Sequence, residues 1–565
     1  MNSKSTIITE KVTDHEIAEG IEDSEDDIGS ALEIVIKHVG EIGLYQRLLF
    51  VIMMPFGLVW SFAYFGQMFI TATPQEHWCR VPELDGLSLE LRRSLSVPKI
   101  SDTEYDQCFM FDANWTQVLE TMLAPDPNTP TIPCTNGWEF LFDDIPYSTI
   151  VNEREWVCDK ASLVPWSQTI SFFGSVVGGI LCGTLADKYG RLPVLILANV
   201  LAFTGGVATV FTHDFWDFAI CRFIVGMSCD SCFIMMYILV LEYVGTKYRS
   251  IVANTSIAMY FGGGCLLLPW ISLWISDWKF ISVAMSVPAV FALATPFVVP
   301  ESTRWLISKG KTDEAVKVLK KFERINKSNI PDDVLENFIA VANKTKEKTE
   351  SVLMIFKTPS LRVMVTLLII AFMGVALMFD NVIRLSENLG LDFFVTFTVT
   401  SATEIPSIII LVLLLDRVGR RWFVTAPMMI AGVLCLAAAF VPRGLASVAL
   451  AVSARFFNNM SYGTVIQWTP ELLPTPVRAS GASFVHISAF AAVMISPFII
   501  YSDRVWEGLS LIIVGVIGIV ASCVALLLPE TKGRRMPQTL DNWETLASTT
   551  CFAKKTGTAD KTDCR

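Results

Sequence analysis

The sequence predicts an all-α membrane protein with twelve transmembrane helices in two pseudo-symmetric six-helix bundles and both termini on the cytoplasmic side. Composition is the first observation behind this prediction: of 565 residues, 52% are hydrophobic and only 18% are charged. A soluble protein carries about 25% charged residues, and the mean hydropathy here is high, at +0.49. The composition therefore favours a polytopic membrane protein over a soluble one.

A repeated spacing is the second observation. Two short charged loops, at 183–192 and 415–421, each end a long apolar stretch. Residues of the same type recur in these loops and beyond them at a single spacing of 229 positions. One shared spacing indicates two copies of one unit in the same order, as in transporters whose sites lie at the membrane midplane between two repeats. The pairs are Asp187 and Asp416, Arg191 and Arg420, Glu242 and Glu471, and Glu301 and Glu530.

Apolar stretches long enough to cross a membrane recur along both copies. A helix needs about 20 residues to span about 30 Å of hydrocarbon. In lipid each stretch must be a helix, because unpaired backbone groups find no water there. The predicted spans are 48–70, 164–186, 193–212, 215–240, 251–275, 278–299, 362–383, 394–415, 422–441, 444–468, 483–501 and 507–528.

Lysine and arginine determine the predicted orientation. The segment 301–357 carries twelve of them, and the shorter basic loops fall on the same side, which the positive-inside rule makes cytoplasmic. The segment 71–160 lies opposite, with sixteen acids and six bases. It contains Asn114 in an acceptor sequence for glycosylation and an even set of cysteines, consistent with two disulfides of open pairing in an oxidising space. The cysteines are Cys79, Cys108, Cys134 and Cys158.

These boundaries divide the chain into consecutive segments. The first is acidic and is expected to be solvated, and an extracellular loop interrupts the first bundle. The predicted segments are the cytoplasmic N-terminal segment 1–47, the first bundle 48–299 with its extracellular loop 71–160, the cytoplasmic central loop 300–361, the second bundle 362–528 and the cytoplasmic tail 529–565.

Several runs of residues match the motifs of one transporter family over nearly the whole chain. They are HWCRVP (77–82), PCTNGWE (133–139), STIV (148–151), VCD (157–159), PESTRWLI (300–307), NLGLDFFVTFT (388–398), EIP (404–406), ELLPTPVR (471–478) and LPETKG (528–533). Together they resemble the organic cation/anion/zwitterion transporters of the major facilitator superfamily, most closely the arthropod organic-cation-transporter-like branch. The resemblance implies the major facilitator fold, a plasma-membrane location and a small-molecule substrate.

The charges of the duplicated loops are predicted to form a cytoplasmic latch that is closed when the cavity faces outward and broken when it faces inward. A tight turn between antiparallel helices needs a residue that tolerates φ > 0, which Gly190 and Gly419 provide. An acid beside the turn can pair with an arginine of a neighbouring loop. The alternative is a topological role, in which the positive charges only orient the helices. The residues assigned to the latch are Asp187, Arg191, Glu242, Arg249, Glu301, Arg304, Asp416, Arg420, Glu471 and Arg478.

Polar side chains inside the helices are predicted to bind the substrate, because they are costly in lipid and usually functional. Buried acids beside aromatic rings suit a cation, through charge pairing and cation–π attraction. The resemblance places the aromatic members at positions that line the family's cavity. The predicted substrate residues are Asp230, Phe233, Tyr237, Phe379, Asp380, Phe394, Phe397, Glu404 and Phe490.

One position departs from the family pattern. Its cation carriers have an aspartate, and its anion carriers an arginine, where this chain has Phe490, so Asp230 and Asp380 are predicted to replace that charge. Asp380 could instead pair with Arg384 on the same helix face and only shape the outer gate. Asp230 could instead form an internal salt bridge or bond a backbone group. His486 is interpreted as a packing residue, with a proton role as the alternative.

The sequence predicts a facilitative, potential-driven carrier of small organic cations or zwitterions, such as amines, amine conjugates or β-amino acids. No acid lies between Leu48 and Ile70, which removes a carboxylate that many proton-coupled relatives carry. An organic anion carrier anchored on Arg384 and a non-transporting sensor or adaptor are the alternatives. Without a nucleotide loop, a nucleophile set or metal-ligand spacing, we expect no enzyme activity, cofactor, metal or nucleic-acid partner. The predicted partners are the substrate and the lipid bilayer.

Overall fold

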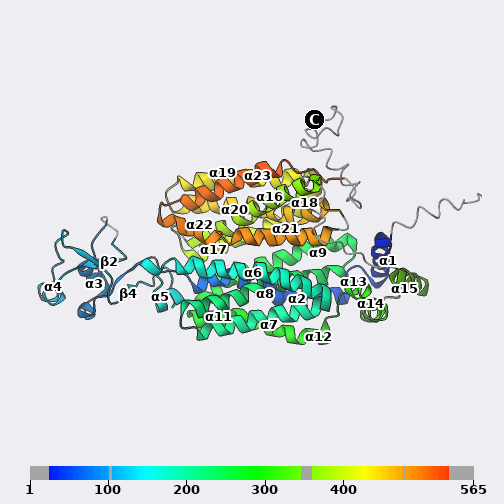
Figure 1. Cartoon of the computed structure of the whole chain (residues 1–565), viewed down its shortest axis with the longest axis horizontal. Coiled ribbons are helices and arrows are strands. Elements are labelled where there is room, and N and C mark those ends of the chain that lie inside the picture. Colours follow the sequence, from blue (N-terminus) through cyan, green and yellow to red (C-terminus); the bar gives the residue numbers. More distant parts are fainter. Residues whose placement is uncertain (1–23, 101–104, 345–358, 388, 475–476, 534–565) are drawn as a thin grey trace, which may run out of the picture.

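The computed structural model describes residues 24–100, 105–344, 359–387, 389–474 and 477–533. Its long helices run side by side in two bundles, one from each half of the chain (Figure 1). A strand domain, formed by residues of the segment 71–160, projects from one end of the bundles. The opposite end carries short helices that precede the first bundle or link the two.

The first bundle lies between residues 44 and 298. Two of its membrane stretches are composite, because a π-helical turn or a 3-10 segment interrupts the α-helix. Its elements are α2 (Leu44–Ile70), α6 (Leu163–Tyr189), α7 (Arg191–Ala208) with η4 (Thr209–Phe211), α8 (Phe215–Glu242), α9 (Thr246–Ser256) with η5 (Ile257–Gly262) and α10 (Gly263–Ile275), and α11 (Trp278–Ser286) with η6 (Val287–Ala294) and α12 (Thr295–Val298).

The second bundle repeats this order between residues 359 and 525. The predicted span 483–501 forms two helices, which meet just before Pro497. Proline has no backbone N–H and so cannot continue the hydrogen-bond ladder of the helix. The elements are α16 (Pro359–Arg384) with η8 (Leu385–Glu387), α17 (Phe393–Ala402) and α18 (Glu404–Val418), α19 (Arg420–Ala439), α20 (Leu445–Leu472), α21 (Arg478–Val493) with α22 (Ser496–Tyr501) and η10 (Ser502–Arg504), and α23 (Leu509–Ala525).

Ten helical segments in the described part of the chain are long and apolar enough to cross a membrane. They correspond to ten of the predicted spans. The other two predicted spans are also helical: α20 carries Arg455 in its interior, and α23 is apolar but only 17 residues long. The chain is therefore a mostly helical, multi-pass membrane protein.

Helices α6 and α8 approach closely through glycine. A Cβ atom added to Gly178 would lie 2.0 Å from the carbonyl oxygen of Met227, and one added to Gly226 would lie 1.9 Å from that of Ser171. Small residues allow backbones to approach in this way, which is how helices pack where lipid supplies no hydrophobic driving force. The contact holds α8, and thus Asp230, at a defined distance from α6.

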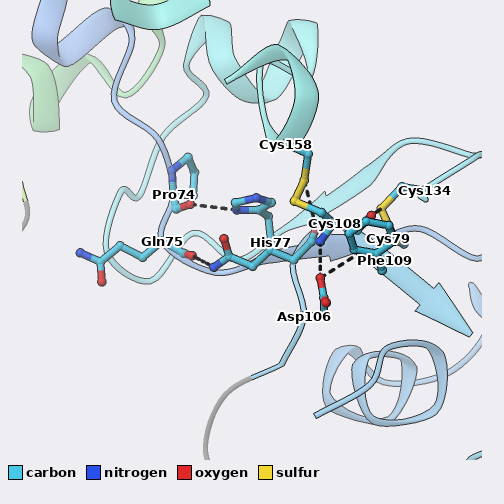
Figure 2. Close-up of a disulfide and its surroundings, with 10 residues drawn as sticks. Pro74, Gln75, His77, Cys79, Asp106, Cys108, Phe109, Cys134 and Cys158 are labelled. Atoms are coloured by element: carbon cyan, nitrogen blue, oxygen red, sulfur yellow. Dashed lines mark hydrogen bonds between the residues drawn. A yellow bond between two sulfur atoms is a disulfide. The ribbon is translucent and has the colours of Figure 1, made fainter. Parts of the chain in front are cut away.

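The strand domain has its own small core and two disulfides (Figure 2). β1 pairs with β4 and β2 with β3, both antiparallel. The four cysteines predicted to form disulfides are joined as Cys79–Cys134 and Cys108–Cys158. The elements are β1 (His77–Cys79), η2 (Pro82–Leu84), α3 (Leu89–Ser96), β2 (Phe109–Phe111), α4 (Trp115–Thr121), β3 (Thr131–Pro133), β4 (Trp138–Phe140), α5 (Ile150–Arg154) and η3 (Cys158–Lys160).

The opposite end of the molecule carries four amphipathic or short helices. α1 packs against α15, and α14 contacts the start of α2. These helices are α1 (Ser24–Val39), α13 (Thr303–Ser308), α14 (Thr312–Asn326) and α15 (Asp332–Lys344). α13, which follows the first bundle directly, lies against the charged loop at 183–192, since Trp305 Nε1 donates to the carbonyl of Asp187 (3.1 Å).

Candidate functional site

Asp380 lies on α16 and is fully buried. Arg384, one turn further, donates from Nε to Asp380 Oδ2 (2.7 Å), and the hydroxyl of Ser496 donates to the same oxygen. Arg384 also donates from Nη1 to Gln168 of α6 (3.2 Å), across the boundary between the bundles. Asp380 therefore makes the ion pair with Arg384 that the sequence offered as the alternative to a substrate contact.

Glu404, at the start of α18, is buried against Arg455 of α20. The carboxylate Oε2 lies 3.7 Å from Arg455 Nη2. The guanidinium of Arg455 lies over the ring of Phe379, 3.6 Å from its centroid, and donates to the carbonyl of that residue. Arg455 was not among the site residues predicted from the sequence. A charged residue in mid-helix was the signal that could have assigned it to the site.

Asp230 of α8 meets His486 of α21, so this contact joins the two bundles. The two atoms, Asp230 Oδ1 and His486 Nε2, are 3.1 Å apart. The carboxylate is buried and the imidazole is largely so, with 4% and 22% of their side-chain areas exposed. The interpretation of His486 as a packing residue missed this partner, because the two residues are 256 positions apart and on different repeats.

The predicted aromatic residues fall into two groups. Phe233 stacks on Trp60 of α2 with ring centroids 3.9 Å apart, and Tyr237 lies 5.3 Å beyond Phe233. Phe379 stacks on Tyr462 of α20 (4.4 Å). Of these rings, Phe379 lies directly against a buried charge, that of Arg455.

A second aromatic group lies toward the strand domain. Phe394 and Phe397 contact Phe69 of α2, with ring centroids 6.1 and 5.0 Å from it. Phe490, by contrast, lies beside the Asp230 contact, 5.4 Å from the ring of His486 and 6.2 Å from that of Tyr64. The nine predicted substrate residues thus form a central group and a smaller group near one end.

A narrow cavity lies between the bundles beside the buried charges. Its walls include Tyr64, Gln168, Phe172, Cys229 and Arg384. The cavity reaches from Cys229, the residue before Asp230 in α8, to Arg384. Its free volume is about 10 Å³, roughly the space of one water molecule. An organic substrate would have to widen it.

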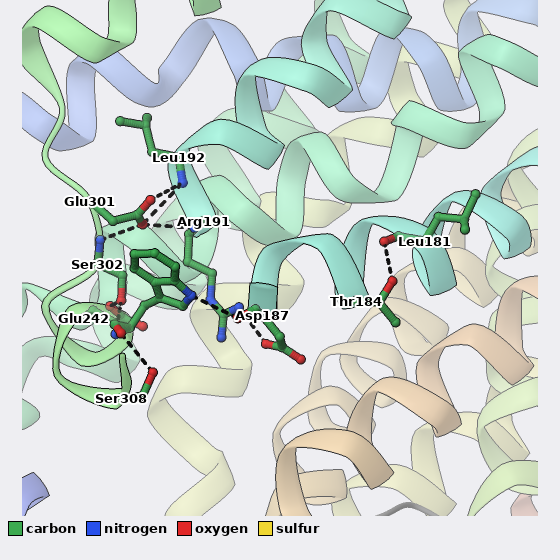
Figure 3. A network of polar contacts seen from close by, with 10 residues as sticks. Leu181, Thr184, Asp187, Arg191, Leu192, Glu242, Glu301, Ser302 and Ser308 are labelled. Carbon is green, nitrogen blue, oxygen red and sulfur yellow. Dashed lines mark hydrogen bonds and ion pairs between the residues drawn. The ribbon is translucent and has the colours of Figure 1, made fainter. Parts of the chain in front are cut away.

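In the first half, Glu301 closes the start of α7 (Figure 3). Its carboxylate accepts hydrogen bonds from the backbone N–H groups of Arg191 (2.9 Å) and Leu192 (3.2 Å). Arg191 in turn pairs with Asp187 (2.8 Å), and the hydroxyl of Ser302 donates to the carboxylate of Glu242. Negative charge at a helix N-terminus is favourable, because the first N–H groups of the helix have no partners within it.

The second half repeats this arrangement. Glu530 accepts from the backbone N–H groups of Arg420 (2.9 Å) and Arg421 (3.0 Å) at the start of α19. Arg420 pairs with Asp416 (2.9 Å) and with Glu471 (3.2 Å). Each of these contacts lies within one half of the chain.

The remaining residues assigned to the latch lie on the same end of the molecule. Arg249 pairs with Glu33 of α1 at 3.6 Å. Arg478 donates to the carbonyl of Leu473 (3.2 Å), and Arg304 is exposed on α13. The residues assigned to the latch thus lie at one end of the molecule, and the role of Glu301 as a helix cap was not predicted.

Two repeated helical bundles, with charged side chains buried between them and matching capped loops at one end, define a membrane transporter with the major facilitator fold. Solved structures agree on the fold. A partially occluded, inward-open structure of the xylose transporter from E. coli superposes with a TM-score of 0.57 over 87% of this chain and 99% of its own, at 16% identity. A proton:xylose symporter bound to a bromodeoxyglucose gives 0.58 over 89% and 99%, at 17% identity.

Sequence comparison identifies the family. Residues 138–543 match the family described as sugar (and other) transporter. The Drosophila melanogaster carcinine transporter is 30% identical over 91% of this chain and 79% of its own, and the β-alanine transporter of the same fly 29% over 90% and 88%. Solute carrier family 22 member 3 of Rattus norvegicus is 29% identical over 91% and 95%. The chain belongs to this family and, within it, to the organic cation/anion/zwitterion transporters; it is not an enzyme.

Proposed function

We propose that this protein carries small organic cations or zwitterions, such as amines, amine conjugates and β-amino acids, across the plasma membrane by alternating access. Twelve helices cross the membrane in this proposal, in the segments given above, and the transport is facilitative and driven by the membrane potential. Both termini and the charged loops face the cytoplasm. The strand domain lies outside, where Asn114 can be glycosylated. Relatives that are transporters of carcinine and of β-alanine support this substrate class.

The observation that carries the proposal is the balance of buried charge. An arginine keeps its charge at any physiological pH, so Asp380 with Arg384 and Glu404 with Arg455 are each neutral as pairs. Asp230 instead faces a histidine, whose neutral form leaves the negative charge of the carboxylate uncompensated. A cationic substrate is the natural partner for that charge.

The surroundings of Asp230 suit an amine. Phe233 lies one turn further on α8, and its stack with Trp60 offers aromatic faces to a cation, an interaction of about 0.5–2 kcal/mol. A zwitterion has a second requirement, since its carboxylate needs a donor. Arg384 lines the cavity between the bundles and can supply a hydrogen-bond donor, which is all that a zwitterion without net charge requires of it. An organic anion anchored on Arg384 is less favoured, since Asp380 already neutralises this arginine.

Contacts between the bundles support alternating access. Near the strand domain, the hydroxyl of Thr169 donates to the carbonyl of Met494 (2.8 Å), and Arg384 donates to Gln168 (3.2 Å). The charged loops at the opposite end make the contacts described above within their own halves. In the proposed cycle these loops form the latch between the halves when the cavity opens outward.

Uptake into cells that express the full chain tests this function. We would measure a panel of organic cations, zwitterions and anions by mass spectrometry, with Asp230→Asn beside the wild type. The matched control is Asp217→Asn, the same change at an exposed position of the same helix. We expect cation or zwitterion uptake that falls with depolarisation, is lost in Asp230→Asn and is retained in Asp217→Asn.

Other outcomes decide between the alternatives. Anion uptake that ignores Asp230→Asn would overturn the substrate class and point to Arg384. Absence of uptake for every compound, with wild-type protein confirmed at the cell surface, would instead favour the non-transporting sensor.

A further inference from the structure

A basic cavity lies at the junction of α1, α2 and α9, far from the buried charges of the transport site. Its volume is 720 Å³. Its lining brings three cations and one acid together from segments that are distant in the sequence. The lining residues are Lys37, Glu41, Ile42, Arg47, Lys247 and Tyr248.

The wall of this cavity is held in place by Asn326, the last residue of α14. Its side-chain oxygen accepts from the backbone N–H of Tyr45 (2.9 Å), and its nitrogen donates to the carbonyl of Val39 (3.1 Å) and to Gln46 (2.9 Å). The turn between α1 and α2 packs so closely on this amide that a Cβ atom at Gly43 would lie 2.2 Å from it. The cavity is therefore framed by fixed backbone.

Its positive charge is not neutralised within the described part of the chain. No ion pair to Lys37, Arg47 or Lys247 is found there, whereas Arg249, two residues beyond Lys247, pairs with Glu33. Glu41 is the acid of the lining, so three cations and one carboxylate leave a net charge of +2. An anion bound here would neutralise positive charges that have no ion-pair partner in the described part of the chain.

The surface next to the cavity is apolar and exposed. On α2, Leu44, Leu48 and Val51 have exposed fractions of 58%, 45% and 64%, and on α9 Ile251 has 51%. Leu48 and Val51 follow Arg47 within about one helical turn, and Ile251 follows Lys247 by one turn. In a membrane protein such side chains face lipid, which places the cations at the level of the headgroups.

We propose that this cavity binds the headgroup of an anionic phospholipid that carries phosphomonoester groups, a phosphoinositide. Arginine presents a planar fork to phosphate oxygens and lysine a point charge. Basic pockets beside membrane helices on the cytoplasmic side suit such headgroups, and this face is the cytoplasmic one in the orientation proposed above. The lipid would tie α1 to α2 and α9 and so stabilise the packing of the N-terminal helix on the bundle.

The test uses the purified full chain in bilayer nanodiscs of phosphatidylcholine, alone or with a phosphatidylinositol bisphosphate or with phosphatidylserine at equal total charge. Bound lipid is counted by native mass spectrometry and the melting temperature is recorded. We expect the bisphosphate lipid to bind and to raise the melting temperature of the wild type. A variant with Lys37→Gln, Arg47→Gln and Lys247→Gln should bind at least tenfold more weakly.

The control variant carries Lys309→Gln, Lys317→Gln and Lys320→Gln, three exposed lysines of the same end of the molecule outside the cavity. It should bind the lipid as the wild type does. Equal loss in the control, or equal binding of phosphatidylserine, would show general surface attraction and overturn the site. Soluble inositol trisphosphate that binds as tightly as the lipid would overturn the lipid as the ligand. Single Lys247→Gln should lose part of the binding, which keeps the test decisive if the triple variant is unstable.

Discussion

In the first half, Glu301 accepts from the backbone N–H groups that begin α7, and in the second half Glu530 accepts from those that begin α19. The correspondence extends to the hydroxyl partners. Ser302 donates to Glu242, and at the same spacing Thr531 donates to Glu471 (2.6 Å). At this end the two copies share the helix caps and the hydroxyl contacts.

The membrane interiors of the two halves differ. Arg222 of the first half donates to the hydroxyl of Thr209, whereas Arg455 of the second half pairs with Glu404. The acid Asp230 has its repeat-related position at Asn459, a neutral residue that donates to Thr403 (3.2 Å). The loops therefore serve a requirement common to both halves. The interiors differ, because the first half has the acid Asp230 where the second half has the neutral Asn459.

The largest effect on stability is expected for substitution of a buried arginine, and it should differ between the two halves. Arg455→Met leaves Glu404 buried without a partner, which should cost about 3–5 kcal/mol of unfolding free energy. Arg222→Met removes one hydrogen bond and should cost about 1 kcal/mol. Thermal unfolding of the purified variants measures both.

The control for this prediction is the double variant with Arg455→Met and Glu404→Gln. It removes the stranded charge and should recover most of the lost stability. Equal losses for Arg455→Met and Arg222→Met would contradict the asymmetry.

Substitutions in the two loop caps should, by contrast, lower the stability by similar amounts in the two halves. Glu301→Ala removes an acceptor shared by three backbone N–H groups, and Glu530→Ala one shared by four. Each variant should lose about 3 kcal/mol of stability, since bonds to a charged acceptor are worth about 1.5–3 kcal/mol and partly reform with water. Glu314→Ala, an exposed acid on α14, is the control and should change little. A large difference between the two cap variants would show that the loops are not equivalent.

The strand domain is inserted in the first half only, so its stability should depend on pH separately from that of the bundles. Burial lowers the pKa of His77 from 6.5 to about 4. Between these values the unfolded domain binds a proton that the folded domain does not, so stability falls as the pH drops. We expect a loss of about 2 kcal/mol from pH 7.5 to pH 5, measured by hydrogen exchange of β1.

The variant His77→Phe provides the control, since a phenyl ring can keep the contact with Phe140 without titrating. Its hydrogen exchange should lose most of the dependence on pH. Glu153, in α5, acts in the same direction but at lower pH: burial raises its pKa, whereas hydrogen bonds from Lys279 and Trp278 outweigh this and lower the pKa below its usual value, so its stabilisation is lost only as the pH falls through the acidic range of a carboxyl group. It therefore adds little to the change above pH 5.

Much of the fold could be predicted because its signals are local in the sequence. Apolar length marks each helix, and the spacing between Arg191 and Arg420 marks the repeat. The charge pairs of the interior depend on how helices rotate against one another, which no local pattern specifies. The pair of Asp380 with Arg384 could be offered as an alternative to a substrate contact because both residues lie on one helix face. The pair of His486 with Asp230 was not predicted, since it requires two helices from different bundles to meet at one level.

The smallest expected effect concerns the contact between Asp230 and His486. Protonation of His486 would neutralise Asp230 and compete with a cationic substrate, because histidine is the side chain that gains charge near neutral pH. Uptake of a quaternary ammonium, whose own charge is constant, should therefore fall about fivefold between pH 8 and pH 6, equivalent to about 1 kcal/mol. His486→Gln keeps a hydrogen-bond donor for Asp230 without the titration, so its uptake should be flat over this range at the level of the wild type at pH 8. If His486→Gln kept the fivefold fall of the wild type, the titrating group would be a residue other than His486. The asymmetry between the interiors of the two halves would then have no part in transport.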